Sequence, residues 1–247
     1  MQFKDKVIIV TGGTTGIGKA TCQQLHAEGA IVYNLDIASA SEDDINFIKC
    51  DVSDYAQVQK AVKTVVDKHK GIDHLFANAG VHLFANLEAT SVEAFEKVLS
   101  INVKGVFFCL KAIIPVMKAQ KRGSIVLMGS DQSFVGKGSS SAYGLTKGAI
   151  GQLTKSTAID YAEYNIKVNC ICPGTIQTPL LDKAVGQFQA ISGLESEAVQ
   201  TILEQAQPIQ RIAQPSEIAK VVCFLLSDAN SFMTGSLVPV DGGYTCQ

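Results

Sequence analysis

Tyr143 and Lys147, in the stretch SSSAYGLTKGAI, have the types and the spacing of an acid–base pair. On a helix, residues four apart lie on the same face, one turn above the other. A tyrosine is a poor base near neutral pH because its ordinary pKa is about 10, but nearby cations favour the phenolate. Such a tyrosine could take a proton from an alcohol or give one to a ketone. A chance pair on a helix surface would have the same spacing, so further motifs must decide.

A second stretch with possible chemistry is GTTGIGKAT at 13–21, which follows the apolar run VIIVTG. Glycine and threonine are ordinary turn residues, so a surface turn is the alternative interpretation. A strand, a glycine-rich loop and an amphipathic helix form the context in which the N–H groups of a helix N-terminus bind pyrophosphate. The spacing is looser than that of the G-x-G-x-x-G motif. We expect a dinucleotide-binding loop made by Gly12, Thr14, Thr15, Gly16, Ile17 and Gly18.

Asp36 stands at the end of the next apolar run, IVYNL at 31–35. An acidic side chain at this point accepts hydrogen bonds from an adenosine ribose and repels a 2′-phosphate. A solvated loop aspartate is the alternative. The position of Asp36 therefore favours NAD over NADP as the cofactor.

Short β-branched runs alternate with helical patterns along the chain. Continuous apolar strands of this kind are typical of a parallel sheet covered by helices on both faces. Expected strands are 7–11, 31–35, 46–50, 72–78, 124–130, 166–172 and 236–242, and expected helices are 16–29, 54–70, 91–118, 142–164 and 215–227. The pattern predicts a single-domain α/β fold over 1–247, Rossmann-like and doubly wound, with seven parallel strands.

Glycine and proline set the expected ends of these helices. Gly29, Gly71 and Gly123 are placed as stop signals, and Pro115 is expected to bend or end the third helix. The connection from Leu35 to Asn46 is too short for a full crossover helix. A long excursion at about 176–210 has helical character, and Gly186 and Gly193 are expected to interrupt it.

Composition excludes several other classes of protein. The net charge of the 247 residues is −2 and no basic stripe occurs, so we expect no nucleic-acid partner. The apolar run near the N-terminus is short for a signal peptide and no run of about 18 apolar residues occurs, so we expect a cytoplasmic protein without a membrane partner. The seven cysteines form no Cys-x-x-Cys pair and the four histidines are not grouped, so no metal site is expected. His82 is a candidate for the wall of a substrate pocket.

From Lys6 to Gly243 the chain resembles the classical short-chain dehydrogenase/reductase family. Ser130, thirteen positions before Tyr143, and Asn102 in SINVKGVF complete a set similar to the Asn–Ser–Tyr–Lys tetrad of that family. The resemblance implies that Ser130 binds the substrate oxygen, that Asn102 anchors a water on the proton path, and that Lys147 also holds the nicotinamide ribose.

Three further motifs carry the resemblance and imply cofactor contacts. They are DVSD on the adenine side, FANAG after the fourth strand, and CPGTIQTP by the nicotinamide, which contribute Asp51, Val52, Asn78, Ala79, Gly80, Pro173, Gly174, Ile176 and Thr178. Members of the family that prefer NADP often place Arg or Lys where this chain has Thr15. NAD is therefore the expected cofactor, and NADP is the less favoured one.

The expected function is NAD(H)-dependent hydride transfer between the nicotinamide and a secondary alcohol or ketone, with Tyr143 as general acid/base. A small polyol or sugar, a hydroxy acid or ester, and an acyl-thioester ketone all remain open as substrates. One alternative is a 3-oxoacyl-thioester (acyl-carrier-protein) reductase, which Asp36 disfavours because that reduction usually draws on NADPH. Another is an NAD(H)-binding sensor or scaffold, which the intact Ser130, Tyr143 and Lys147 disfavour.

Two expectations concern larger structure. The resemblance implies a homotetramer, and the helices expected at 91–118 and 142–164 carry apolar residues beyond a single stripe. The excursion at 176–210 is interpreted as a mobile lid over the substrate. A rigid pair of helices that covers the sheet edge is the alternative.

Overall fold

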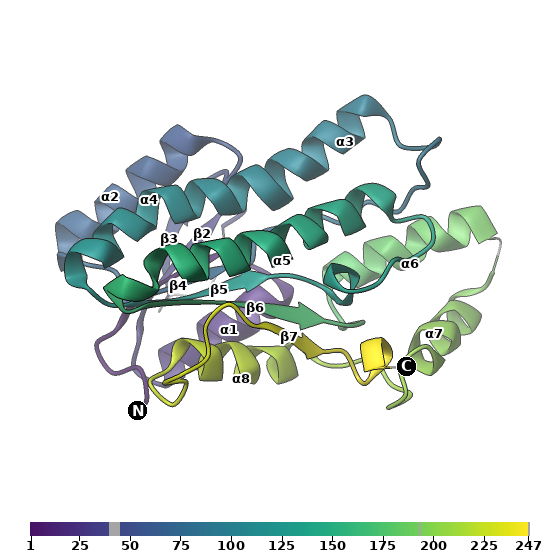
Figure 1. Cartoon of the computed structure of the whole chain (residues 1–247). Coiled ribbons are helices and arrows are strands. Elements are labelled where there is room, and N and C mark those ends of the chain that lie inside the picture. Colours follow the sequence, from purple (N-terminus) through teal and green to yellow (C-terminus); the bar gives the residue numbers. More distant parts are fainter. Residues whose placement is uncertain (40–44, 193, 247) are drawn as a thin grey trace.

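All seven strands form one parallel sheet, whose order is β3-β2-β1-β4-β5-β6-β7 (Figure 1). The computed structural model describes residues 1–39, 45–192 and 194–246, and the side chains of 190–192 are not considered. The strands are β1 (Val7–Thr11), β2 (Ile31–Asp36), β3 (Asn46–Lys49), β4 (His74–Ala77), β5 (Gly123–Met128), β6 (Ile166–Pro173) and β7 (Leu237–Val240). The predicted fold class and all seven predicted strands are confirmed.

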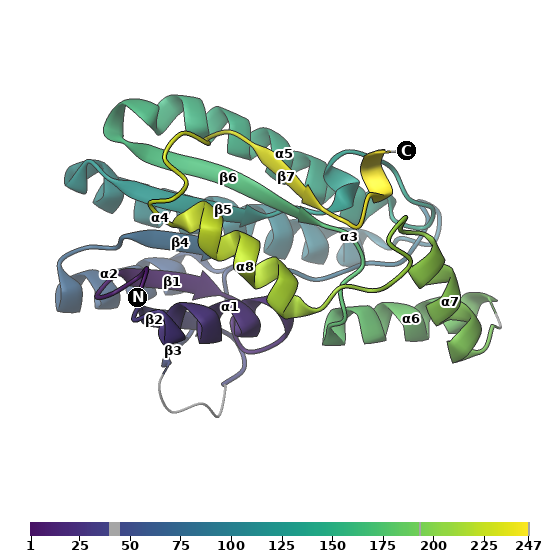
Figure 2. The same cartoon turned by 90° about the horizontal axis from the view of Figure 1, so that it is seen from below.

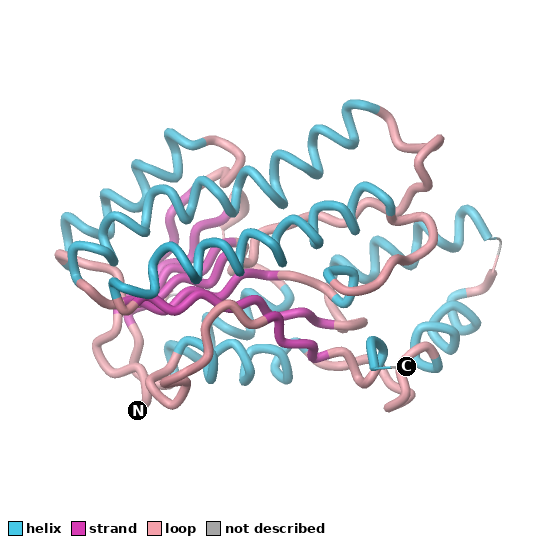
Figure 3. Tube along the Cα trace, in the orientation of Figure 1, coloured by secondary structure: helices cyan, strands magenta, loops and turns pink. Residues whose placement is uncertain are grey.

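Helices cover both faces of the sheet (Figures 1 and 3). One face carries α1 (Gly16–Ala27) and α8 (Pro215–Leu226), and the other carries α2 (Tyr55–His69), α4 (Gly105–Gln120) and α5 (Ser141–Tyr161), as the view from below also shows (Figure 2). A right-handed crossover between parallel strands places a helix on the sheet face, so the alternation of runs in the sequence produces this layering.

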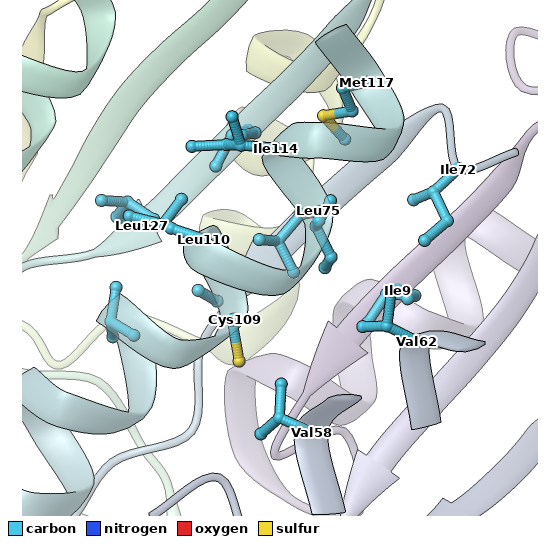
Figure 4. Packing of buried hydrophobic residues seen from close by; sticks show 14 of the residues in the cluster. Ile9, Val58, Val62, Ile72, Leu75, Cys109, Leu110, Ile114, Met117 and Leu127 are labelled. Atoms are coloured by element: carbon cyan, nitrogen blue, oxygen red, sulfur yellow. The ribbon is translucent and has the colours of Figure 1, made fainter. Parts of the chain in front are cut away.

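The two faces of the sheet bury separate hydrophobic clusters. Along β1, Ile9 packs into the cluster under α2 and α4, whereas Ile8 and Val10 pack into the one under α1 and α8. Figure 4 shows Ile9 and Leu75 of the sheet facing side chains of α2 and α4. Because successive residues of a strand point to opposite faces and both faces are covered, the strand must be apolar throughout.

The chain reverses its direction of winding between β1 and β4. β1 pairs with β2 on one side and with β4 on the other, so the loops that leave the carboxyl ends of β1 and β4 diverge. In open α/β sheets this reversal leaves a crevice at the carboxyl edge, where ligands bind. The fold therefore places the glycine-rich loop, which follows β1, beside the FANAG segment, which follows β4.

The third predicted helix is an unbroken helical run in three parts: α3 (Val92–Leu99), a π-helical turn (Ser100–Lys104) and α4. Pro115 lies inside α4, which continues to Gln120, so of the two predicted effects, bending or ending the helix, the ending is wrong. By length and composition this run could cross a membrane, but 44% of its most apolar window is buried in the fold. That burial is typical of a helix that packs on a core sheet.

Only one of the three glycine stop signals works as predicted. Gly29 adopts the left-handed conformation (φ 91°), but after α2 and α4 that conformation belongs to Lys70 (φ 64°) and Lys121 (φ 54°). Gly71 meets a different constraint: a Cβ there would lie 2.4 Å from the Gln120 side-chain oxygen. That amide bonds both the N–H and the carbonyl of Ile72, at 2.9 Å each, so the space must stay empty.

The excursion consists of α6 (Pro179–Ser192) and α7 (Ser196–Gln205), which lie beyond the carboxyl ends of the strands (Figure 2). Gly186 lies within α6 and does not interrupt it, so that prediction is wrong. The second predicted break, Gly193, and residues 40–44 of the β2–β3 connection lie outside the described residues.

Candidate active site

A cavity of about 870 Å³ opens at the carboxyl edge of the sheet and gathers nearly all of the predicted site residues. Two predicted residues, Gly18 and Asn102, do not line it. The predicted residues that do are Gly12, Thr14, Thr15, Gly16, Ile17, Asp36, Asp51, Val52, Asn78, Ala79, Gly80, His82, Ser130, Tyr143, Lys147, Pro173, Gly174, Ile176 and Thr178.

In the glycine-rich loop, some glycines are needed for their backbone conformation and others because another backbone segment packs directly against them. Gly12 and Gly16 have positive φ angles of 67° and 55°. A Cβ on Gly18 would lie 2.1 Å from the Gly12 carbonyl oxygen, so Gly18 allows α1 to pack directly on the loop. In the described part of the chain no side chain caps the start of α1, and its first turn has no acidic residue. The first N–H groups of this helix are therefore suited to bind an anion.

Asn78 ties the end of β4 to the glycine-rich loop. Its side-chain amide donates to the carbonyls of Thr11 (3.0 Å) and Gly12 (2.9 Å). The Thr11 hydroxyl in turn accepts from the backbone N–H groups of Asn78 and Ala79, both at 3.0 Å. These four bonds hold two loops that are far apart in sequence in a fixed relation around the cavity.

Asp36 is held by the backbone of the loop that it faces. One carboxylate oxygen accepts from the Thr14 N–H (3.0 Å) and the other from the Ala38 N–H (3.2 Å). Each oxygen has a second lone pair that could accept from the hydroxyls of a ribose. Asn34, which the sequence analysis did not single out, supports this arrangement, since its buried amide bonds the Gly13 N–H (2.8 Å) and the Thr14 hydroxyl (3.1 Å).

Tyr143 lies in the first turn of α5, and its side chain lines the cavity together with Ser130. Burial raises the pKa of Tyr143 well above its usual value, the charge on Asp131 raises it further, and the side chain of Ser130 opposes both. Lys147 is not among the groups that shift this pKa, and the lowering expected from Lys147 together with a nicotinamide stays a prediction. The Lys147 ammonium lies 5.4 Å from the ring centroid and donates to the Met128 carbonyl (2.9 Å), so it is not directed at the phenol.

Lys147 itself is buried, with 5% of its surface exposed. Burial lowers its pKa to about 8, although Cys170 and Cys172 behind it on β6 act in the opposite direction. A lysine with this pKa can hold or release a proton within the ordinary working range of an enzyme.

Asn102 lies in the π-helical turn and is 2% exposed. Its amide oxygen accepts from the Val81 N–H (2.9 Å), and its nitrogen donates to the Val81 carbonyl (2.9 Å) and to the Thr146 hydroxyl (3.2 Å). Asn102 thus fastens the segment after β4 to the turn of α5 that carries Tyr143. Its part in a water-mediated proton path stays a prediction.

An ion pair between Asp131 and Lys137 stands directly behind Ser130. The Ser130 hydroxyl donates to one Asp131 oxygen (2.8 Å), and the Lys137 ammonium lies 2.6 Å from the other. The sequence alone does not show that these two residues pair. The sequence feature that could have indicated this pair is an acidic residue directly after Ser130 and a lysine six positions after that acidic residue.

His82 packs against Tyr143, with 4.5 Å between the ring centroids. Burial lowers its pKa to about 4; the charges of Lys137 and Lys147 act in the same direction and Asp131 opposes them. Phe84 stacks on His82 and meets Phe188 of α6 edge-on at 5.6 Å. The apolar wall of the cavity is continued by Leu180, Leu181, Val185, Val199, Ile202 and Leu203 of the excursion.

These observations fit a dinucleotide with an acidic pyrophosphate centre. The uncapped start of α1 could hold the pyrophosphate, Asp36 the adenosine ribose, and Lys147 the nicotinamide ribose. A Cβ on Gly12 would lie 2.9 Å from the Ala79 Cα. The loops that follow β1 and β4 therefore pack against each other where the pyrophosphate would bind. The apolar wall formed by the excursion faces the remaining volume.

Comparisons with known proteins agree with this geometry. Residues 12–245 match the family described as "Enoyl-(Acyl carrier protein) reductase". The chain is 34% identical to levodione reductase of Leifsonia aquatica, over 98% of this chain and 95% of that one. It is also 34% identical to cyclopentanol dehydrogenase of Comamonas sp., over 99% and 98% of the two chains. A solved structure, ElxO with NADP bound, superposes with a TM-score of 0.89 at 31% identity, over 98% of this chain and all of that chain.

The chain therefore belongs to the short-chain dehydrogenase/reductase family, as the resemblance predicted, and it is an oxidoreductase. Members of this family bind a nicotinamide cofactor, and the cavity described above is where the residues predicted to bind it converge.

The partly buried His82 predicts a pH dependence of stability. Because the pKa of His82 is lowered to about 4 in the folded protein, the unfolded chain binds more protons between that pH and the ordinary histidine pKa. Stability is present at neutral pH and is lost as the pH falls through this window, by about 1.4 kcal/mol per pH unit. His82→Gln should reduce the slope of unfolding free energy against pH, measured by urea denaturation. His26→Gln, at an exposed histidine, should leave it unchanged; equal slopes in all three proteins would contradict the assignment.

Proposed function

We propose that this chain is an NAD(H)-dependent oxidoreductase that transfers a hydride between the nicotinamide and a secondary alcohol or ketone, with Tyr143 as general acid/base. The observation that carries the proposal is that Ser130, Tyr143 and Lys147 line the same cavity as the glycine-rich loop. A phenol and a hydroxyl in the same cavity can bind one substrate oxygen from two directions.

In this reaction the side chains of the protein transfer a proton and position the substrate oxygen. The bound nicotinamide would supply or accept the hydride at the carbon of the substrate. Tyr143 donates its proton to the oxygen during reduction and accepts one during oxidation. Ser130 holds the same oxygen, which positions the carbon and stabilises charge on the oxygen. Burial of Tyr143 and Lys147 keeps bulk water away from this step.

The cavity wall supports an alcohol or ketone with an apolar body. Phe84 and Phe188 contact each other edge-on across the cavity, while the polar groups gather at Ser130 and Tyr143. The relatives named for cyclopentanol and levodione support the same substrate class. A 3-oxoacyl thioester remains the second candidate, because the matched family is described as an enoyl-(acyl carrier protein) reductase, a name that supports an acyl-thioester substrate and specifies an enoyl group, not a 3-oxo group.

Tyr143→Phe tests the proposal directly. The ring stays and the proton carrier is lost, so kcat should fall by about 10²–10⁴-fold while cofactor affinity changes little. Turnover of a panel of secondary alcohols and ketones, followed by the absorbance of the reduced nicotinamide, is the measurement. Tyr161→Phe, at the far end of the same helix, is the matched control and should retain activity. A folded Tyr143→Phe protein that turns over like wild type would exclude this role.

The preference for NAD rests on Asp36, whose carboxylate accepts hydrogen bonds from the backbone N–H groups of Thr14 and Ala38. Replacing Asp36 with Ala removes the charge that repels a 2′-phosphate. The ratio of kcat/KM for NADP to that for NAD should rise by about tenfold or more, which corresponds to about 1.4 kcal/mol. The ElxO structure shows that a relative binds NADP. If the wild-type protein uses NADPH as efficiently as NADH, the proposed preference is wrong.

We infer a homotetramer as the assembly. Phe107 of α4 is 48% exposed, and Leu145 and Ile159 of α5 are 52% and 78% exposed, so both helices present apolar side chains away from the sheet. Such a second stripe supports burial against another subunit. Light scattering should give the mass of four chains at micromolar concentration, and the mass of a single chain would contradict the inference.

We infer that α6 and α7 act as a lid. Their apolar residues line the cavity, and Phe188 makes the edge-on contact with Phe84 that would close it. A lid orders on binding and excludes water from the site of hydride transfer. Hydrogen exchange should be faster across 180–189 and 196–205 than in the sheet without ligand, and slower once cofactor and substrate are added. Protection equal to that of the strands in the free protein would leave a rigid helix pair instead.

A further inference from the structure

The amide of Gln207 joins three segments next to the cavity. Gln207 follows α7 by two residues and is 2% exposed. Its side-chain oxygen accepts from the Thr175 N–H (3.2 Å), and its side-chain nitrogen donates to the Arg211 carbonyl (3.0 Å). Gly174 packs directly against this amide, since a Cβ there would lie 2.7 Å from the Gln207 oxygen. The buried amide thus fixes the end of α7 against the loop that follows β6, and both of its polar ends are satisfied.

The loop after β6 lies on the side of the cavity where the nicotinamide half of a dinucleotide would extend. In the order of the sheet, β2, which ends at Asp36, and β6 lie on opposite sides of β1. A dinucleotide with its adenosine ribose at Asp36 and its pyrophosphate at the start of α1 must therefore direct its other half toward β5 and β6. Thr175 and Ile176, which follow β6, line the cavity on that side together with Ser130.

The segment after α7 also holds this loop through its backbone. The Ala213 N–H donates to the Thr175 carbonyl (3.2 Å), and the Gln177 N–H donates to the Ala213 carbonyl (2.9 Å). With the bond from the Thr175 N–H to Gln207, three hydrogen bonds join the two segments. α7 itself contributes to the apolar wall of the cavity. Since Gln207 stands between α7 and this contact, the position of the helix and the position of the loop depend on each other.

We propose that Gln207 is a positioning residue that links α7 to the loop after β6, so that binding of the nicotinamide half of the cofactor and ordering of the lid favour each other. Gln207 is not among the residues that line the cavity, so it acts through Thr175 and not by touching the ligand. Coupling of this kind is reciprocal: if the ordered lid favours binding of the nicotinamide half, that half favours the ordered lid by the same factor. The inference rests on the proposed function, because it takes a nicotinamide dinucleotide as the ligand.

Gln207→Met tests this role by binding and needs no turnover. Methionine has a similar length and makes neither hydrogen bond, so the Thr175 N–H loses its partner. The Kd for NADH, measured by calorimetry, should rise by about tenfold, the size expected for one backbone group left unpaired. ADP has the adenosine and the two phosphates but lacks the nicotinamide half, so its Kd should stay nearly unchanged. A merely destabilised fold would weaken both ligands alike.

Gln120→Met is the matched control. The Gln120 amide bonds the N–H and the carbonyl of Ile72, at 2.9 Å each, and neither residue lines the cavity. The substitution therefore removes two hydrogen bonds of the same kind at a place remote from the ligand, and both Kd values should be those of the wild type. If Gln207→Met weakens NADH and ADP by the same factor, or weakens neither, the positioning role is wrong.

Hydrogen exchange on the wild-type protein tests the coupling without any substitution. NADH should slow exchange across 174–178 and across 196–205 together, whereas ADP should leave both segments nearly as they are in the free protein. In Gln207→Met, NADH should protect 196–205 less than it does in the wild type. Protection of 174–178 by NADH in the wild type with no change across 196–205 would overturn the coupling.

The two proposals fail in different ways. If Tyr143→Phe turns over like wild type, the proposed general acid/base is wrong, and a selective loss of NADH affinity in Gln207→Met still supports the positioning role. If Tyr143→Phe loses turnover while Gln207→Met binds NADH and ADP like wild type, the positioning role is wrong and the proposed function stands. A wild-type protein that binds neither NADH nor ADP would overturn both.

Discussion

The contact between the loops that follow β1 and β4 is the constraint on which the site depends. The Asn78 amide bonds the Thr11 and Gly12 carbonyls, and the Gly18 Cα lies so near the Gly12 carbonyl that no side chain fits between them. If these loops separated, the start of α1 would no longer face the cavity. The close packing of backbone on backbone explains why glycine is required at positions 12 and 18, and it converts a flexible sequence into a rigid cradle.

A second network places Tyr143 relative to that cradle. Asn102 joins the segment after β4 to the first turns of α5, through Val81 and Thr146. It can do so because the π-helical turn at Ser100–Lys104 interrupts the regular spacing between α3 and α4. π-Helical turns inside longer helices occur frequently at functional sites, and here the turn carries a buried polar side chain that has partners for both ends of its amide.

Burial governs the electrostatics of the site more than any single pair of charges. It raises the pKa of Tyr143 and lowers those of Lys147 and His82, so each group is biased toward its neutral form. Neutral groups cost less to bury than charged ones, which allows the polar cluster to coexist with an apolar cavity wall. The Asp131–Lys137 pair is the exception, and its two charges stabilise each other where the cavity meets solvent.

The sequence by itself determined the fold class, the seven strands and most of the predicted residues that gather at the cavity. Local patterns suffice for these, because a strand buried on both faces must be apolar and a crossover helix must follow it. Local patterns did not reveal that Lys70 and Lys121 would take the left-handed positions, or that α4 would continue past Pro115. Nor did they show that burial and the charge of Asp131 raise the pKa of Tyr143, against the lowering expected from Lys147 and a nicotinamide. Only the tertiary structure decided these points, since burial, the direction of the Lys147 ammonium and the pairing of Asp131 with Lys137 depend on which segments meet in space.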